Sequence, residues 1–324
     1  MPTILDQPPA DIAAKLQQIR SLLDAAIPAK WVDRNLIIAT WNIRAFGDLT
    51  EKWMSGKNDS PKRDLGSLLL IEEIVSRFDL VALQEVKGNI KALRHMLKAL
   101  GTSWGFILTD VTLGSAGNDE RMAFVFDTRR VKPSGLAGEL VVPEEWLNAE
   151  SLSPDTLTKQ FARTPYAVSF LAGGETFILV TVHVIFGQGP SDRIAELRGI
   201  ARWLADWAKR EESWGHNLIA LGDFNIDRAG DANYQAFTST GLRPPSELDS
   251  APRTIFASGP DSFYDQIAWF TESGSVPVLS LDYSGRAGFF DFTPVFPGTL
   301  TKLELSWRMS DHYPLWVEFN CKRS

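Results

Sequence analysis

The sequence predicts a mixed α/β protein in which strands and helices pack in layers. Eight apolar runs of strand length alternate with stretches of helical periodicity. Hydrophobic residues make up 44% of the 324 residues, which is enough for a large core and excludes disorder as the main state. Such alternating elements bury their apolar faces by forming layers.

The elements are expected in a definite order along the chain. Ile12, Leu16, Ile19 and Leu23 recur at helical spacing, which predicts a helix over residues 10–25. Further helices are expected over 64–77, where Asp64 is a capping residue, over 88–100, and from Ser191 to about residue 210. The expected strands span residues 36–43, 79–86, 122–126, 166–171, 175–184, 217–224, 263–270 and 314–319, and Gly173-Gly174 predicts a hairpin between two of them.

The chain also divides by composition. Residues 1–30 read as an N-terminal helical extension and residues 31–324 as a single folded domain. Residues 133–158 contain five acidic residues and no Lys or Arg, so they are expected to form a surface insertion. The acidic residues are Glu139, Glu144, Glu145, Glu150 and Asp155.

Charge and cysteine content limit the classes of function. The 33 Lys and Arg against 40 Asp and Glu give a net charge of −7, which disfavours a protein that holds nucleic acid by counter-charge alone. Cys321 is the single cysteine, so neither an intramolecular disulfide nor a cysteine zinc site is expected. No signal peptide or membrane segment is recognisable, and we expect a cytoplasmic protein.

Polar side chains end the predicted strands at five places. A buried carboxylate is costly unless it is paired or binds a cation, and a single Asp or Asn there is usually a turn former. Five in one chain instead indicate a site. Asp223 and Asn225 would share one face if their strand continues. The five places hold Asn42 with Arg44, Glu85, Asp223 with Asn225, Asp265, and Asp311 with His312, and His183 ends another run.

The order of these segments along the chain resembles that of a known superfamily. Trp41-Asn42-Ile43-Arg44, Gln84-Glu85-Val86, the strand-end His183, Gly222-Asp223-Phe224-Asn225, Tyr264-Asp265-Gln266-Ile267 and Ser310-Asp311-His312 succeed one another as in the endonuclease/exonuclease/phosphatase superfamily. Within it the chain most resembles deoxyribonuclease I, from about residue 31 to 319. The resemblance implies a four-layered sandwich of two mixed, mostly antiparallel sheets flanked by helices, and makes residues 31–324 the catalytic domain.

The resemblance also implies roles for individual residues. Asn42, Glu85 and Asp311 would surround the metal, and this oxygen-rich set suits Mg²⁺ or Mn²⁺, whereas the sequence gives no support for Ca²⁺. Asp223 and Asn225 would orient the attacking water and hold the phosphate. His183 and His312 would flank the phosphate, steadied by Glu120 and Asp265 respectively, and partly cationic because of these carboxylates.

The resemblance implies phosphate contacts as well. Arg44 and Arg163 match residues of this kind. Lys87 stands where the nuclease has an arginine, which keeps the charge but loses the bidentate fork. Asn118 stands where the nuclease has a tyrosine that packs against a sugar in the minor groove.

The sequence supports three hypotheses about function. The leading one is a Mg²⁺- or Mn²⁺-dependent endonuclease that cuts DNA with little sequence preference, acts as a monomer and needs no obligate protein partner. The alternative uses the same residues on a phospholipid, an inositol phosphate or another small phosphoester. A non-catalytic binding module ranks last, because every matched position keeps a chemically competent side chain.

Two basic stretches qualify the acidic total. Residues 52–63 and 121–132 each hold four Lys or Arg against one Asp. If they border the strand ends that carry Asn42 and Glu120, they would form a phosphate-guiding rim, and otherwise they are solvated surface.

Overall fold

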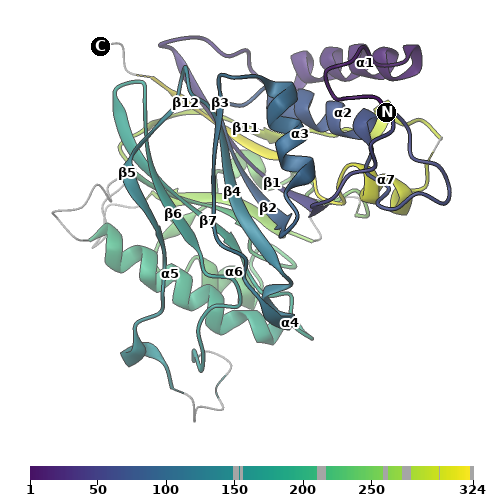
Figure 1. Cartoon of the computed structure of the whole chain (residues 1–324). Helices are drawn as coiled ribbons and strands as arrows, with labels where there is room; N and C mark the ends of the chain where they lie inside the picture. Colours follow the sequence, from purple (N-terminus) through teal and green to yellow (C-terminus); the bar gives the residue numbers. More distant parts are fainter. Residues whose placement is uncertain are drawn as a thin grey trace.

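Two six-stranded β-sheets pack against each other in the centre of the structure (Figure 1). The computed structural model describes residues 1–148, 153, 156–209, 217–257, 262–271, 279–298 and 300–321. The first sheet has the order β11-β12-β1-β2-β4-β3 and the second the order β5-β6-β7-β8-β10-β9. Helices cover both outer faces, as Figure 1 shows for α1, α2 and α3 on one side and α5 on the other. The expected four-layered sandwich is confirmed.

The strands of the first sheet are β1 (Asn35–Phe46), β2 (Leu80–Lys87), β3 (Trp104–Leu108), β4 (Glu120–Asp127), β11 (Asp282–Phe289) and β12 (Leu315–Asn320). Those of the second are β5 (Lys132–Glu139), β6 (Tyr166–Ala172), β7 (Glu175–His183), β8 (Leu218–Asp223), β9 (Leu242–Arg243) and β10 (Asp265–Phe270). The α-helices are α1 (Ala10–Ala26), α2 (Leu65–Val75), α3 (Lys91–Leu100), α4 (Gly114–Gly117), α5 (Ile194–Ala208), α6 (Ala232–Phe237) and α7 (Lys302–Arg308). Short 3₁₀ turns include η2 (Pro190–Arg193) ahead of α5.

All eight expected strands are present, and the local signals act as expected. Asp64 caps α2 by accepting a hydrogen bond from the Ser67 amide at 2.8 Å. Gly173 and Gly174 have φ values of +56° and +80°, which fit the tight turn between β6 and β7.

The four strands that the sequence did not predict, β3, β5, β9 and β11, are the edge strands of the two sheets. β5 and β11 contain glycines and consist only of exposed and half-buried residues, so they lack a buried apolar run. The segment 133–158, expected to be a surface insertion, therefore begins as edge strand β5. Its Glu150 and Asp155 lie outside the described residues.

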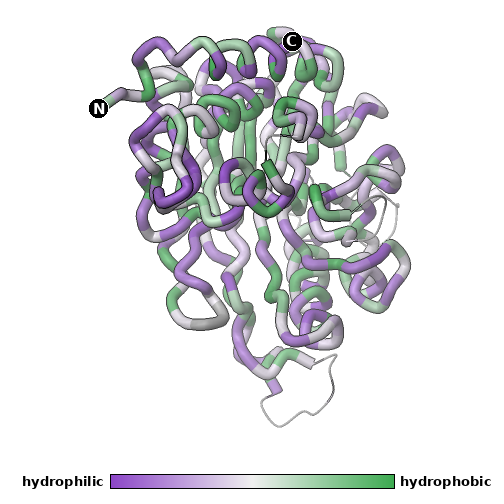
Figure 2. The backbone as a smooth tube through the Cα atoms, turned by 90° about the vertical axis from the view of Figure 1, so that its right-hand side faces the viewer, coloured by the Kyte–Doolittle hydropathy of each residue, from purple (hydrophilic) through white to green (hydrophobic). Residues whose placement is uncertain are grey.

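Three apolar clusters separate the layers. One lies between the sheets and combines Ile38 and Phe124 of the first sheet with Leu179 and Ile267 of the second. The other two lie between each sheet and its helices. Figure 2 shows the same arrangement, with hydrophobic segments gathered inside and hydrophilic segments in the outer loops.

Helix α1 packs on the outer side of α2. Its Ile19 and Leu23 are fully buried and belong to the same apolar cluster as Trp41 of β1. Arg20 Nε also lies 2.7 Å from Glu73 Oε2 of α2. The division of the chain at residue 30 stays a prediction. Among the described helices, none has the length and hydropathy needed to cross a bilayer.

Strand direction brings distant polar residues to one edge. β1 and β2 run parallel, and so do β7 and β8. A hydrogen bond from Asn42 to Asp223 joins the two pairs, so that Asn42, Glu85, His183 and Asp223 line one pocket. Register shifts after Asn42 in β1 and after Leu83 in β2 mark bulges next to this edge.

We expect Ile19→Ala to lower the free energy of unfolding by about 2–5 kcal/mol, because it opens a cavity beneath α1. Urea unfolding followed by circular dichroism measures this. Gln17→Ala, an exposed change on the same helix, is the control and should stay within about 0.5 kcal/mol of wild type. Equal stability of both variants would contradict burial of α1 against the body.

Candidate active site

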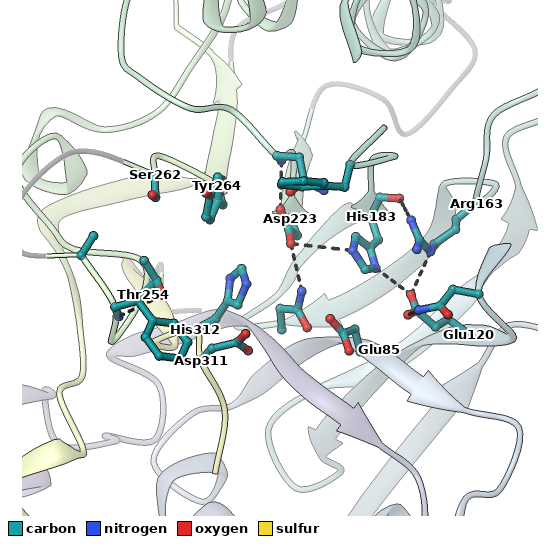
Figure 3. Close-up of a pocket in the computed structure, with 16 residues that line it drawn as sticks. Glu85, Glu120, Arg163, His183, Asp223, Thr254, Ser262, Tyr264, Asp311 and His312 are labelled. Atoms are coloured by element: carbon teal, nitrogen blue, oxygen red, sulfur yellow. Dashed lines mark hydrogen bonds and ion pairs between the residues drawn. The ribbon is translucent and has the colours of Figure 1, made fainter. Parts of the chain in front are cut away.

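A pocket of about 520 Å³ opens at the edge where the strands end (Figure 3). Nine of the twelve site residues expected from the sequence line it. They are Asn42, Glu85, Glu120, Arg163, His183, Asp223, Asn225, Asp311 and His312. Figure 3 shows His312 and His183 on opposite sides of Asp223, with Glu85 and Asp311 below.

Asp223 lies at the centre of this pocket. It is 2% exposed and accepts hydrogen bonds from Asn42 Nδ2 and from the Asn225 amide, both at 2.9 Å. Burial raises the pKa of Asp223, but the charges of His312 and His183 outweigh it and lower the pKa below its ordinary value. Asp223 is therefore ionised at neutral pH.

Asp223 and Asn225 both line the pocket, but the expectation that they share one face of a continuing strand is wrong. β8 ends at Asp223, and Asn225 has a φ of +51°, so the chain turns there. The Asn225 side chain donates to the carbonyl oxygen of Val184 at 2.7 Å. Turn geometry, rather than strand alternation, places Asn225 beside the pocket.

Glu120 joins three nitrogen-bearing side chains on one wall. Its carboxylate lies 3.0 Å from His183 Nδ1, 2.8 Å from Arg163 Nε and 2.9 Å from Lys87 Nζ. Burial opposes ionisation, but His183, Arg163 and Lys87 lower the pKa of Glu120 to about 2. Because Glu120 fixes Nδ1, the Nε2 atom of His183 faces Asp223, 3.7 Å from Asp223 Oδ2.

His312 and Asp265 form the opposite wall. His312 Nδ1 lies 2.6 Å from Asp265 Oδ2, and Asp265 is fully buried behind the ring rather than lining the pocket. Burial alone would lower the pKa of His312, but Asp265 with Asp223 and Asp311 raises it well above its ordinary value. His312 is therefore cationic at neutral pH.

The floor of the pocket fits a divalent cation. Asn42 Oδ1 and Asp311 Oδ1 are buried without a hydrogen-bond partner. Glu85 has a φ of +59° at the β2 bulge, and its Oε2 atom accepts from the Ala45 amide at 2.8 Å. Two oxygens without hydrogen-bond partners, together with the Glu85 carboxylate, are the hard donors that Mg²⁺ and Mn²⁺ prefer.

A second group of possible ligands lies nearby. Asp223, Asp265 and His312 place one ligand atom each within 4.8 Å of one another. The ion pair between His312 and Asp265 already occupies this group, and a cationic imidazole cannot bind a metal. Asn42, Glu85 and Asp311 are thus the better cation ligands.

The sequence was compared with known protein families, and the match agrees with the two sheets described above. Residues 39–312 match the Endonuclease/Exonuclease/phosphatase family. The chain belongs to this family. It is accordingly a phosphoesterase.

Relatives within the family include two nucleases. The chain is 28% identical to a deoxyribonuclease of Thioalkalivibrio sp. (strain K90mix), covering 88% of this chain and 71% of the relative. It is 24% identical to deoxyribonuclease gamma of Rattus norvegicus, covering 90% and 86%.

Solved structures of the family share the fold at lower identity. The human Nocturnin catalytic domain with bound sulfate has a TM-score of 0.55 at 20% identity, covering 90% of this chain and 96% of that one. A mannosyl-6-phosphatase of Bacteroides thetaiotaomicron has a TM-score of 0.52 at 18% identity, covering 88% and 99%.

Arg44 and Lys87 lie outside the pocket lining. Arg44 Nη1 is 3.5 Å from Asp311 Oδ2, and its guanidinium stacks 3.9 Å from the Trp307 ring centroid. Lys87 contacts Glu120 and the Asn118 carbonyl oxygen. Asn118 does line the pocket, and its amide hydrogen-bonds Glu120.

No Lys or Arg of the two basic stretches lines the pocket. Arg63 is buried and donates to the carbonyl oxygens of Arg44 and Ala45, so it supports the β1 bulge from behind. Arg129 and Arg130 pair with Asp127 and Asp79, at the far end of β4 and β2 from the pocket. Because β4 begins at the pocket and runs away from it, residues after β4 cannot reach the site.

Several residues around the pocket were not singled out from the sequence. Ser310 Oγ donates to the Asn42 carbonyl oxygen at 2.6 Å and accepts from the His312 amide at 3.1 Å, which ties β1 to the His312 loop. Its place in Ser-Asp-His was the available signal. Phe186 and Phe256 also line the pocket, and no motif marks them.

Glu120→Gln should lower the free energy of unfolding at pH 7 by about 3 kcal/mol, because folding lowers the pKa of Glu120 from 4.5 to about 2. A depressed carboxyl pKa stabilises the fold above the unfolded pKa, and this contribution is lost as pH falls through the folded pKa. The difference from wild type should therefore shrink between about pH 5 and pH 2.

Urea titrations from pH 7 to pH 3 measure this difference. Glu139→Gln, on an exposed carboxylate of edge strand β5, is the control and should show no such pH dependence. A Glu120→Gln deficit that stays constant from pH 7 to pH 3 would contradict the ionised network.

Proposed function

We propose that this family member is a Mg²⁺- or Mn²⁺-dependent endonuclease that hydrolyses DNA phosphodiester bonds with little sequence preference. The observation that carries this proposal is the pair of carboxylate-backed histidines that face each other across Asp223. Hydrolysis of a phosphodiester needs an oriented water, cations around the phosphoryl oxygens and a proton for the leaving oxygen. The pocket offers a group for each requirement.

Asn42, Glu85 and Asp311 would hold the metal. When bound, the cation would supply positive charge against the phosphoryl oxygens. The orphaned oxygens of Asn42 and Asp311 support this assignment, because buried acceptors without partners are costly unless a ligand satisfies them.

The protein residues would divide the proton transfers. The ionised Asp223, held by the Asn42 and Asn225 hydrogen bonds, would orient the attacking water and accept its proton as the new oxygen–phosphorus bond forms. The cationic His312 would donate a proton to the leaving oxygen as the old bond breaks. His183 Nε2 and Asn225 would bind the phosphoryl oxygens, with Glu120 and Asp265 as positioning residues.

Phosphate binding would rest mainly on Arg163. It is the only Arg or Lys among the described residues that line the pocket, and it contacts Glu120 beside His183. Arg44 and Lys87 would support phosphates beyond the pocket lining. The names of the two sequence relatives support DNA as the substrate.

A second candidate is a small phosphoester. A pocket of about 520 Å³ with one arginine is of the size that encloses a small ligand. Release of inorganic phosphate from a sugar phosphate, compared with nicking of supercoiled plasmid, separates the two candidates.

Glu85→Ala should abolish plasmid nicking in Mg²⁺ and weaken Mn²⁺ binding measured by calorimetry, because a charged ligand is lost from the floor. Glu139→Ala, on β5 and outside the pocket, should keep both properties. Wild-type nicking by Glu85→Ala at equal Mg²⁺ would contradict the metal assignment.

His312→Ala, which removes the proton donor, should reduce kcat by about 10²- to 10⁴-fold. His183→Ala, which removes a donor to the phosphoryl oxygens, should reduce kcat by about 10²- to 10³-fold. Initial rates of oligonucleotide cleavage measure this effect. His95→Ala is the matched control, since His95 lies on α3 outside the pocket. Near-normal turnover of either pocket variant would overturn the two-histidine arrangement.

A further inference from the structure

Two phenylalanine rings are exposed at the catalytic pocket. Phe186 is 59% exposed and Phe256 is 49% exposed, and both line the pocket that holds the histidines. Burial of a phenylalanine side chain stabilises a protein, and these two rings give up about half of that burial. Single exposed apolar residues are ordinary, but two at one pocket need an explanation.

Phe186 is held in place on the His183 side. The guanidinium of Arg193 lies 4.5 Å from its ring centroid, and Arg193 Nε donates to the Phe186 carbonyl oxygen at 2.8 Å. The same guanidinium donates to the carbonyl oxygen of Asn225 at 2.6 Å. One buried arginine thus fixes both the ring and a pocket residue.

The backbone that carries Phe256 is tied to the His312 side. Thr254 forms a β-bridge with His312, and the Ile255 amide donates to the Asp311 carbonyl oxygen at 2.9 Å. The Phe256 amide donates to Thr254 Oγ1 at 3.3 Å. Phe186 therefore lies beside the His183 end of the pocket, and the Phe256 segment is joined to the segment that carries His312.

Cationic groups for a second DNA strand are scarce here. Arg163 is the sole Arg or Lys that lines the pocket in the described part of the chain. Arg44 and Lys87 lie just outside the lining, and each is paired with a carboxylate of the pocket. Arg129 and Arg130 pair with carboxylates at the far end of the sheet. Duplex affinity depends mainly on phosphate contacts, so this surface is poorly equipped to hold two strands.

We propose that Phe186 and Phe256 form a stacking platform for unpaired bases next to the cleaved phosphate, so that single-stranded or locally unpaired DNA is the preferred substrate. This inference rests on the proposed nuclease function. In a duplex, neighbouring base pairs cover the faces of each base, whereas an unpaired base leaves its face free for an aromatic ring. Stacking tolerates every base, which agrees with weak sequence preference.

The test compares kcat/KM on a single-stranded oligonucleotide and on the same sequence as a duplex, in Mg²⁺. Wild type should favour the single strand. Because stacking on one ring contributes about 1–3 kcal/mol, Phe186→Ala and Phe256→Ala should each lower this preference by about 5- to 150-fold. Phe186→Leu and Phe256→Leu, which keep an apolar side chain but lose the aromatic face, should also lower it.

Phe106→Ala is the matched control, because Phe106 is a 44% exposed ring on β3 outside the pocket. It should keep the wild-type preference. Binding of the labelled single strand is also measured for Glu85→Ala protein and for the same protein with Phe186→Ala or Phe256→Ala added. This comparison separates stacking from turnover. Equal losses on single strand and duplex, or a wild type that favours the duplex, would overturn the inference. Cleavage of neither DNA would instead defeat the nuclease proposal.

Discussion

The site depends on a hydrogen bond that crosses between the two sheets. Asn42 of β1 donates to Asp223 of β8 at 2.9 Å, and a second bond joins Gln84 of β2 to Thr181 of β7 at 3.0 Å. All four side chains are buried, so each polar atom needs a protein partner. The sheets must therefore approach at this edge, and their approach brings together ligands, histidines and carboxylates that are far apart in the sequence.

Charge neutralisation at this edge explains how an acidic chain can accommodate a phosphate. Glu120 is surrounded by His183, Arg163 and Lys87, and Asp265 is matched by His312. His312 balances Asp265 in one wall, and Arg163 with Lys87 outweighs Glu120 in the other. A cation on the floor beside Glu85 would give the centre its positive charge, so the net charge of −7 describes the surface and not the site.

Strand ends and motif order made much of the fold and site predictable from the sequence. Apolar runs mark the buried strands, and the polar residues that end them, such as Glu85 and Asp223, were identified for that reason. The turn at Asn225, the positive φ of Glu85 and the edge strands β5 and β11 were not predictable, since tertiary contacts impose them. Arg129, Arg130 and Lys132 lie away from the site because of strand direction, since β4 begins at Glu120 beside the pocket and ends at Asp127 far from it.

The charged residues of the pocket are largely paired with one another, which affects how substrate can bind. Each histidine is fixed by a carboxylate, and Arg163 is partly neutralised by Glu120, so little net charge remains to bind substrate before the metal is present. Binding energy must then come from groups away from the reacting phosphorus. Phe186 and Phe256 are joined through their backbones to the segments of the pocket, so energy gained by stacking on their rings would help to position the phosphate between His183 and His312.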